Sequence, residues 1–360
     1  MFKDFQKLIQ KHKKHWLTIA FVLGFVVDNL TLNRVDQLFD NIVLTSYVVL
    51  AMGSLLMLYA GAAERLPEKM SQKARDYAPL VTQYAFGGLF SGMLIFYGRA
   101  GSWYESWPFL LIILAIIFGN EMIRDRSQRL IFNLSVLFIG MFSYIVLLIP
   151  VLFGKMGAFI FIGSGLLALI IMYWYVKVLR KIVPKFIALH QRFIVFSIGF
   201  IFALFNILYF TNVIPPIPLS LKDVGIYHSV VRFETGEYQL TYEKPSWWEW
   251  YRDSDKVFHP TKGGNVFCFA AVFAPTRLET DIYHQWQRYD EETGEWVDRS
   301  RISYPISGGR DGGFRGYTLL SAYTEGKWRC QVETARGQVL GSAVFEIAVD
   351  EVPNLVTRVE

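Results

Sequence analysis

The amino-acid sequence predicts a membrane all-α bundle of seven transmembrane helices, followed by an all-β domain of the immunoglobulin-like sandwich type. Apolar residues make up 53% of the 360 residues and charged residues only 19%, with a mean hydropathy of +0.30. Soluble globular chains carry roughly 25% charged residues, so this composition indicates a membrane protein. Beyond Pro215, apolar and polar residues alternate with the two-residue period of β-strands. A disordered, collagen-like or disulfide-dense chain is excluded.

Seven stretches in residues 16–214 are long and apolar enough to cross a bilayer as helices, which takes ~20 residues each. A basic tail, residues 1–15, precedes them. No small-residue cleavage site follows the first stretch, where Asp28 and Asn29 stand instead, so we expect that helix to stay as an uncleaved anchor. The predicted spans are Trp16–Leu32, Ile42–Gly61, Pro79–Gly98, Trp107–Ile123, Leu130–Phe153, Gly157–Leu179 and Phe193–Val213.

The distribution of lysine and arginine predicts the orientation of these spans. Of the basic residues before Pro215, 17 fall in the tail and in loops two, four and six, whereas only Arg34, Arg99 and Lys155 fall in the other loops. Cytoplasmic loops carry the excess of basic residues. We therefore predict a multi-pass protein of the bacterial inner membrane, with a cytoplasmic N-terminus and a periplasmic C-terminal domain.

The charge of the chain indicates contact with membrane lipids rather than with nucleic acid. Residues 1–214 carry 20 basic and 10 acidic residues, a net charge of +10, whereas residues 215–360 carry 16 and 21, a net charge of −5. The isoelectric point near 9.0 thus reflects basic loops beside a membrane. A nucleic-acid-binding domain would instead gather basic residues on one folded face.

The β domain is expected over residues 222–350, after a stiff Pro-rich linker at residues 215–221 and before a loose tail at residues 351–360. Turn signals such as Thr235-Gly236 separate its strands. Seven or eight short strands in ~130 residues are typical of an immunoglobulin-like sandwich, and a small barrel is the alternative. The candidate strands are Gly225–Phe233, Glu237–Tyr242, Asn265–Ala274, Ile282–Tyr289, Trp296–Tyr304, Phe314–Tyr323, Lys327–Thr334 and Val339–Val349.

The C-terminal region resembles a bacterial domain of unknown function, number 2914. The residues that carry the resemblance are His284, Trp286, Arg299–Arg301, Gly308–Gly316, Gly326–Thr334, Gly337 and Leu340. The membrane half is similar to segments that often precede this domain, through Asp28, Thr31, Leu32, Arg34, Asp36, Ser102, Asn120, Glu121 and Pro150. The resemblance implies a cell-envelope membrane protein of no assigned activity and supplies no catalytic residue. In that family the position of Cys330 is more often apolar.

Two polar clusters lie in or beside the predicted spans, where charged side chains usually have a partner. Asp28, Arg34 and Asp36 form the first. Arg34 is placed to bridge both carboxylates and so fix the short first helix; a docking point for the outer domain or for a polar ligand is the alternative. Asn120 and Glu121 form the second. We expect Glu121 to pair with a nearby arginine, and a proton or ion relay is the alternative.

The aromatic run at Trp247, Trp248, Trp250 and Tyr251 is the most unusual feature of the outer half. Three tryptophans in four residues cannot all be buried in a strand, because side chains alternate between its faces. Three interpretations stay open: a contact surface for sugars or a partner, insertion into the outer headgroup layer, or a corner of the core.

A glycine-rich segment, Gly308–Gly316, does not have the phosphate-loop pattern. We expect a long flexible connection between strands that presents Arg310 and Arg315 to a ligand. Cys268 and Cys330 lie on predicted strands of the periplasmic domain, an oxidising compartment, where a disulfide between them can form. Such a bond requires a Cα separation under ~7 Å. Two small core residues are the alternative.

The histidines of the outer half do not have the spacing of a metal site. His228, His259 and His284 are dispersed, and no nucleophile elbow or pair of catalytic carboxylates is present. We therefore expect no cofactor or metal, and a non-enzymatic protein whose sandwich binds an envelope glycan or a periplasmic or membrane protein. The alternative is a small-solute transporter or a lipid-linked membrane enzyme with the sandwich as an accessory domain.

The orientation can be tested with reporters fused after Glu360. Because the basic residues favour a cytoplasmic N-terminus and seven spans put the C-terminus outside, alkaline phosphatase fused there should be active. Green fluorescent protein at the same position should stay dark. A fluorescent fusion with an inactive phosphatase would contradict the orientation and the periplasmic placement with it.

Overall fold

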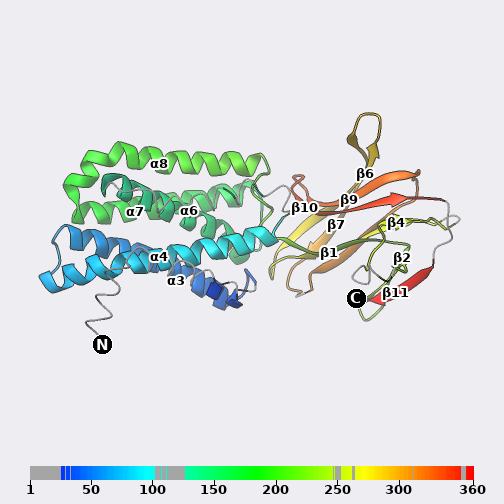
Figure 1. Cartoon of the computed structure of the whole chain (residues 1–360), viewed down its shortest axis with the longest axis horizontal. Coiled ribbons are helices and arrows are strands. Elements are labelled where there is room, and N and C mark those ends of the chain that lie inside the picture. The colour runs from blue at the N-terminus through cyan, green and yellow to red at the C-terminus, as the bar shows by residue number, and fades with distance from the viewer. Residues whose placement is uncertain are drawn as a thin grey trace. The chain divides into compact units, whose positions relative to one another are not determined.

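The computed structural model describes residues 26–28, 30–32, 34–101, 107, 111, 126–245, 247, 253–261, 264–310, 312–349 and 354–360, with the backbone alone at residues 126–129. The chain divides into two compact units. Long helices make up the first unit and β-strands the second, with the change at Ile214 and Pro215 (Figure 1).

Five helices in the described residues are long and apolar enough to cross a membrane. They confirm five of the seven predicted spans. The first and fourth predicted spans, Trp16–Leu32 and Trp107–Ile123, fall mostly outside the described residues. The helices are α3 (Leu38–Ala62), α4 (Glu68–Arg99), α6 (Arg126–Phe153), α7 (Ala158–Ile182) and α8 (Pro184–Phe210).

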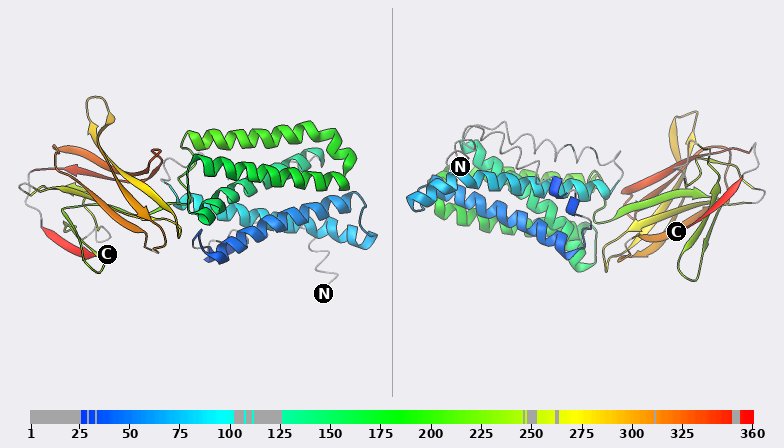
Figure 2. Two further views of the ribbon diagram at one scale, coloured as in Figure 1. Left: turned by 180° about the vertical axis from the view of Figure 1, so that it is seen from behind. Right: turned by 60° about the horizontal axis from the view of Figure 1, so that its bottom comes forward.

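The helices run side by side (Figure 2), and small or aromatic side chains set their spacing. Gly88 of α4 packs against the Tyr47 ring of α3, and Gly92 packs against Leu44. A Cβ at either glycine would overlap these side chains. The small-residue face of α4 therefore serves internal helix packing. Around α6, Phe142 packs against the rings of Phe138, Phe161, Phe202 and Phe205.

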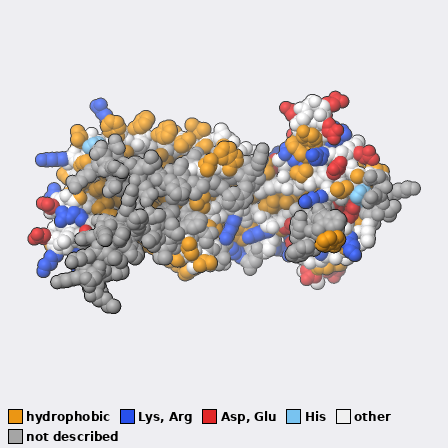
Figure 3. Space-filling view, viewed as in Figure 1, with side chains coloured by type: hydrophobic (Ala, Val, Ile, Leu, Met, Phe, Trp, Pro, Cys, Tyr) orange, Lys and Arg blue, Asp and Glu red, His pale blue; other side chains and the backbone are white. Residues whose placement is uncertain are grey.

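The surface of the helical unit has the composition expected of a membrane protein. Large apolar side chains such as Phe159, Leu189 and Phe196 are exposed on α7 and α8, and apolar atoms cover much of the described helix surface (Figure 3). A helix that faces lipid needs this outward apolar surface.

The strands of the described residues form three sheets, whereas an immunoglobulin-like sandwich has two. The central sheet has the order β1 (Ser220–Tyr227), β5 (Val266–Phe273), β8 (Phe314–Leu320). The five-stranded sheet has the order β4 (Val257–Phe258), β10 (Val339–Ile347), β9 (Gly326–Thr334), β6 (Glu279–Asp290), β7 (Glu295–Ser307). The outer sheet has the order β11 (Leu355–Val359), β3 (Tyr238–Glu243), β2 (Ser229–Arg232).

β5, the middle strand of the central sheet, is buried on both faces. Cys268 of β5 packs in one core with Trp286, Trp328 and other residues of the five-stranded sheet. The next residue along, Phe269, packs in a second core with Leu240 of the outer sheet. A strand covered on both faces reads as a continuous apolar run, and β5 has the sequence VFCFAAVF. The outer sheet is thus a third layer on a two-sheet sandwich.

Three predictions about the strands need correction. The expected strand Gly225–Phe233 is interrupted at His228, where β1 ends and β2 begins. The expected linker at residues 215–221 already contains the start of β1, at Ser220. The expected tail at residues 351–360 contains β11, which pairs antiparallel with β3. A five-residue edge strand has a weak sequence signal because its stability comes from its neighbour.

A disulfide joins the central sheet to the five-stranded sheet. Cys268 of β5 and Cys330 of β9 are bonded, and their Cα atoms lie 6.5 Å apart, within the range that a disulfide spans. Both side chains are fully buried. The bond closes a segment of 62 residues that contains β6, β7 and β8.

Replacing both cysteines by alanine should lower the free energy of unfolding by about 4 kcal/mol, because the unfolded chain regains the freedom of that closed loop. Equilibrium unfolding of the full chain in detergent, followed by tryptophan fluorescence, measures this change. Ser307→Ala, at an exposed position on the same segment, is the control and should change stability little. Two free thiols in the unreduced, unfolded wild-type chain would contradict the bond.

Candidate functional site

Part of the predicted aromatic run lies on the segment between β3 and β4, residues 244–254, which we call the aromatic segment. Trp247 is 83% exposed. Trp248, Trp250 and Tyr251 lie outside the described residues. A tryptophan that keeps most of its surface in water is not a core residue, so the core-corner interpretation does not hold for Trp247.

Four side chains meet where the aromatic segment leaves and rejoins the sheets. We call His228, Glu243, Asp255 and His259 the histidine–carboxylate cluster. Nε2 of His228 lies 3.1 Å from Oε1 of Glu243 and 3.6 Å from Oδ2 of Asp255. His259 donates to Glu243 twice, from its backbone N–H to Oε1 over 2.6 Å and from Nδ1 to Oε2 over 2.8 Å. The cluster thus gathers residues that are up to 31 positions apart.

Burial and hydrogen bonding act against each other on Glu243. Burial raises the pKa of its carboxyl, but the hydrogen bonds from His228 and His259 outweigh that effect and hold the pKa below its ordinary value. Glu243 is therefore an ionised carboxylate that only accepts hydrogen bonds. Its own backbone N–H donates to Oδ1 of Asp255 over 2.7 Å.

Backbone hydrogen bonds hold both ends of the aromatic segment. The Asp255 N–H donates to the Ile226 carbonyl at the end of β1, over 3.0 Å. The Lys244 N–H donates to the Asn354 carbonyl, over 2.8 Å. Arg358 of β11 adds an ion pair with Asp253. The segment that carries Trp247 therefore starts and ends at fixed points.

Arg358 also ties the end of the chain to β1. Its Nη2 lies 2.7 Å from Oδ2 of Asp223 and 2.7 Å from the Tyr227 hydroxyl. Burial raises the pKa of Tyr227 above its ordinary value, so this group stays a neutral phenol. The sequence prediction of a loose tail missed this anchor.

The predicted arginines lie before β8, at Arg310, and near its start, at Arg315. The Arg315 carbonyl accepts a hydrogen bond from the Tyr238 hydroxyl, at the opposite end of β3 from Glu243. At ~3.3 Å per residue, the length of β3 places Tyr238 and Glu243 roughly 16 Å apart. Arg310 is exposed and lies over the Phe314 ring, 5.7 Å from its centre.

The two ends of the glycine-rich segment, expected as a flexible connection, are held by packing. A Cβ at position 308 would clash with the Pro275 carbonyl, so only glycine fits there. The Gly308 N–H donates to the Leu278 carbonyl. Gly316 is part of β8 and lies under the Tyr304 ring. These glycines permit close approach of neighbouring chain segments.

The first membrane polar cluster is paired differently from the prediction. Arg34 forms a bidentate ion pair with Asp36, over 2.8 and 3.0 Å. It does not bridge to Asp28, which is fully buried and accepts a hydrogen bond from the Tyr47 hydroxyl over 2.7 Å. The ring of Tyr47 reaches Asp28 because Gly88 leaves space for it. Asn120 and Glu121 lie outside the described residues.

His284 lies at the centre of a buried polar chain in the β domain. Its Nδ1 lies 2.9 Å from Oγ1 of Thr318, and its Nε2 lies 3.0 Å from the Tyr304 hydroxyl. Trp286 donates from Nε1 to the same Thr318 oxygen, over 3.1 Å. Burial lowers the pKa of His284 to about 3, so its imidazole stays neutral and uses one nitrogen to donate and the other to accept.

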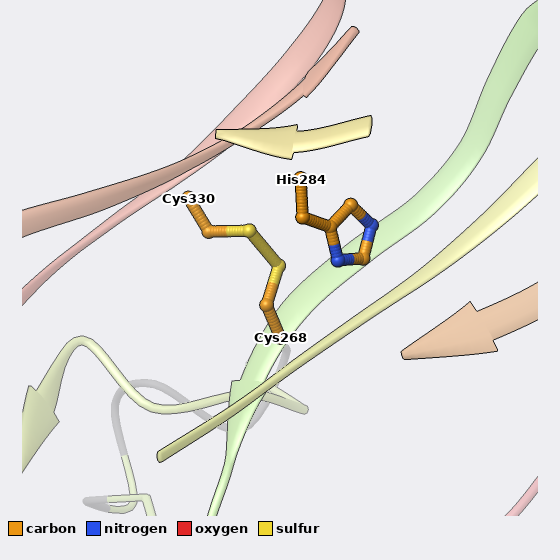
Figure 4. A group of neighbouring side chains, drawn as sticks. All are labelled: Cys268, His284 and Cys330. Carbon is orange, nitrogen blue, oxygen red and sulfur yellow. A yellow bond between two sulfur atoms is a disulfide. The ribbon is translucent and has the colours of Figure 1, made fainter. Parts of the chain in front are cut away.

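Cys268 and Cys330 lie beside His284 in this core (Figure 4). Two thiolates and an imidazole would be a plausible donor set for a metal. In this structure the two sulfur atoms are bonded to each other, and both His284 nitrogens have hydrogen-bond partners. This group is therefore a structural core and not a metal site.

The residues around this core are those that carry the family resemblance. Residues 279–347 match the family model described as "Protein of unknown function (DUF2914)". The DUF2914 match begins at the start of β6 and ends at the end of β10, so it contains the His284–Trp286 pair. It confirms the resemblance seen in the sequence. The family has no assigned activity.

The other comparisons add no functional information. No curated protein matches the chain. A solved structure titled "Pseudomonas fluorescens alkylpurine DNA glycosylase AlkC bound to DNA containing an abasic site analog" aligns at 12% identity over 88% of this chain and 99% of that one, with a TM-score of 0.19. A TM-score this low supports no conclusion about fold or function. The histidine–carboxylate cluster lies outside the DUF2914 match.

Ligand motifs of short spacing do not predict the histidine–carboxylate cluster. His228 and His259 are far apart along the chain, and Glu243 joins them only after three strands have folded. One usable signal was present: Glu243 and Asp255 flank the aromatic run, four residues from each of its ends.

The buried His284 makes the stability of the DUF2914 region dependent on pH. The unfolded chain binds a proton at His284 below a pKa near 6.5, whereas the folded chain does not bind it until about pH 3. Its contribution to stability is complete above pH ~6.5 and falls as the pH drops, by about 2 kcal/mol at pH 5. His284→Gln should remove this part of the difference in Tm between pH 7.5 and pH 5.

The measurement is thermal unfolding of the full chain in detergent, followed by near-ultraviolet circular dichroism. His190→Gln, at a half-buried histidine of α8, is the matched control and should keep the wild-type pH dependence. An unchanged pH dependence in His284→Gln would show that His284 does not cause it.

Proposed function

We propose that this chain is a non-enzymatic protein of the bacterial inner membrane whose β domain faces the periplasm and binds an envelope glycan or a protein partner. Seven spans would anchor the domain, with the N-terminus in the cytoplasm. The aromatic segment would make the contact. The observation that carries the proposal is the exposure of Trp247 on a segment whose two ends are fixed.

Fixed ends favour binding because they reduce the freedom that a contact must restrict. Ordering a loop on binding costs free energy, and a segment whose ends are already held loses less. Glu243, Asp255 and Arg358 hold these ends here. A tryptophan ring offers a large flat apolar face, which suits a sugar ring or an apolar side chain of a partner.

The predicted arginines contribute unequally to such a site. Arg315 interacts electrostatically with Glu360, which also contacts Arg358, so it would stand at the margin of the contact surface. Arg310 is exposed and could supply a polar contact to a ligand.

A second candidate function lies in the helices, and buried Asp28 favours it. An ionisable side chain inside a membrane bundle is costly and often functional. Here Asp28 is fully buried and hydrogen-bonded to Tyr47. Small-solute transport or lipid-linked chemistry in the bundle would depend on this pair, with the β domain as an accessory.

The two functions can be separated by substitution. If the aromatic segment binds, Trp247→Ala, Trp248→Ala and Trp250→Ala should each weaken binding by roughly 30-fold, the loss expected of a central aromatic contact. Cosedimentation of the full chain in detergent with isolated peptidoglycan measures glycan binding. Crosslinking in cells from a photoreactive residue at position 247 detects a protein partner.

Trp296→Ala is the matched control, because Trp296 is a partly exposed tryptophan elsewhere in the same domain. It should keep binding intact. The bundle hypothesis predicts instead that Asp28→Asn removes the cellular phenotype and that a chain ending at Pro216 retains it. Full complementation by that truncated chain would overturn the binding proposal.

A further inference from the structure

We propose that the histidine–carboxylate cluster is a binding site for a divalent transition-metal ion, with zinc as its best probe. His228, Glu243 and Asp255 would be the ligands, and His259 would orient Glu243. This proposal does not depend on the binding function of the aromatic segment, since it concerns only the described residues at the base of that segment.

The distances between the donor atoms fit one small metal ion. Two ligand atoms at 2.0–2.1 Å from a tetrahedral zinc ion lie about 3.3 Å from each other. Nε2 of His228 lies 3.1 Å from Oε1 of Glu243 and 3.6 Å from Oδ2 of Asp255. One ligand atom of each of the three residues lies within 4.8 Å of the others. A bound ion would replace the hydrogen bond between His228 and Glu243, because Nε2 of His228 must give up its proton to bind a metal.

The donor set indicates which metal would bind. One imidazole and two carboxylates combine nitrogen and oxygen ligands, as zinc sites do, whereas magnesium and calcium prefer oxygen alone. Cysteine plays no part, because Cys268 and Cys330 are bonded to each other. Three protein ligands leave a fourth position of a tetrahedral site for water or for another group.

The ligands are held in place before any ion arrives. The His228 ring stacks on the Phe258 ring, with centroids 4.1 Å apart and planes 15° from parallel. Glu243 is oriented by the two hydrogen bonds from His259. Asp255 is fixed by its backbone bond to Ile226 and by the Glu243 N–H. Hydrogen-bonded outer residues of this kind orient the ligands of metal sites.

The charge of the cluster also favours a cation. Glu243 and Asp255 place two carboxylates next to one another, and the Asp255 side chain has no solvent exposure. Buried charges need compensation. A divalent ion bound between them would supply this compensation.

A bound ion would join the end of β1, the end of β3 and the segment before β4. The last two of these are the ends of the aromatic segment. The ion would therefore hold the two ends of this segment together.

Cobalt(II) titration of the metal-free full chain in detergent tests the site. One equivalent should bind and give the visible absorption bands of a four- or five-coordinate ion with nitrogen and oxygen ligands, and zinc should displace it. This readout uses the wild-type chain, so it does not depend on whether a variant folds. Failure to bind one equivalent would overturn the proposal.

Variants then locate the bound ion. His228→Gln and Asp255→Asn should each lower zinc affinity by roughly 100-fold or more, and His259→Gln by about 10- to 100-fold, because outer residues have smaller effects. His12→Gln with His15→Gln, in the basic tail, and Glu346→Gln, at an exposed position of β10, are the controls and should bind as wild type. Loss of the ion in the tail variant, with retention in His228→Gln, would place it elsewhere and refute the proposal.

Discussion

The ionised Glu243 is the constraint around which the outer part of the β domain is arranged. A partly buried carboxylate must find hydrogen-bond donors or a cation, because leaving it unpaired in the protein is costly. Its donors come from two places in the chain: His228 at the junction of β1 and β2, and His259 just after β4. That requirement fixes where β3 ends and where the chain returns to the five-stranded sheet. The exposed Trp247 stands on the segment between these points.

The core of the domain explains why the DUF2914 match cannot be the whole folding unit. Trp286, Trp328 and Cys330 fall within the match, yet they pack against Ile226 of β1 and Cys268 of β5, which lie before it. Without β1 and β5 these large side chains would be exposed to water, at a cost of roughly 25 cal/mol per Å² of apolar surface. The disulfide binds the matched region to β5 at the centre of this core.

In the helical unit, too, a buried side chain depends on residues far from it in the sequence. The absence of a side chain at Gly88 makes room for the Tyr47 ring, and the hydroxyl of that ring satisfies buried Asp28. A polar group inside a membrane bundle therefore depends on a glycine of another helix. Arg34 and Asp36, by contrast, satisfy each other two residues apart. Asp28 and the Arg34–Asp36 pair, which were predicted to form one cluster, thus have separate partners.

The sequence by itself determined the features that depend on periodicity and composition. Five long apolar stretches became helices, and the alternating region became strands at most of the expected places, because burial patterns repeat at 3.6 or 2 residues within each element. Only the tertiary structure decided the third sheet, the pairing of β11 with β3 and the meeting of His228, Glu243, Asp255 and His259. These contacts join residues far apart in the chain, and no local pattern specifies which distant partner will satisfy an edge strand or a buried charge.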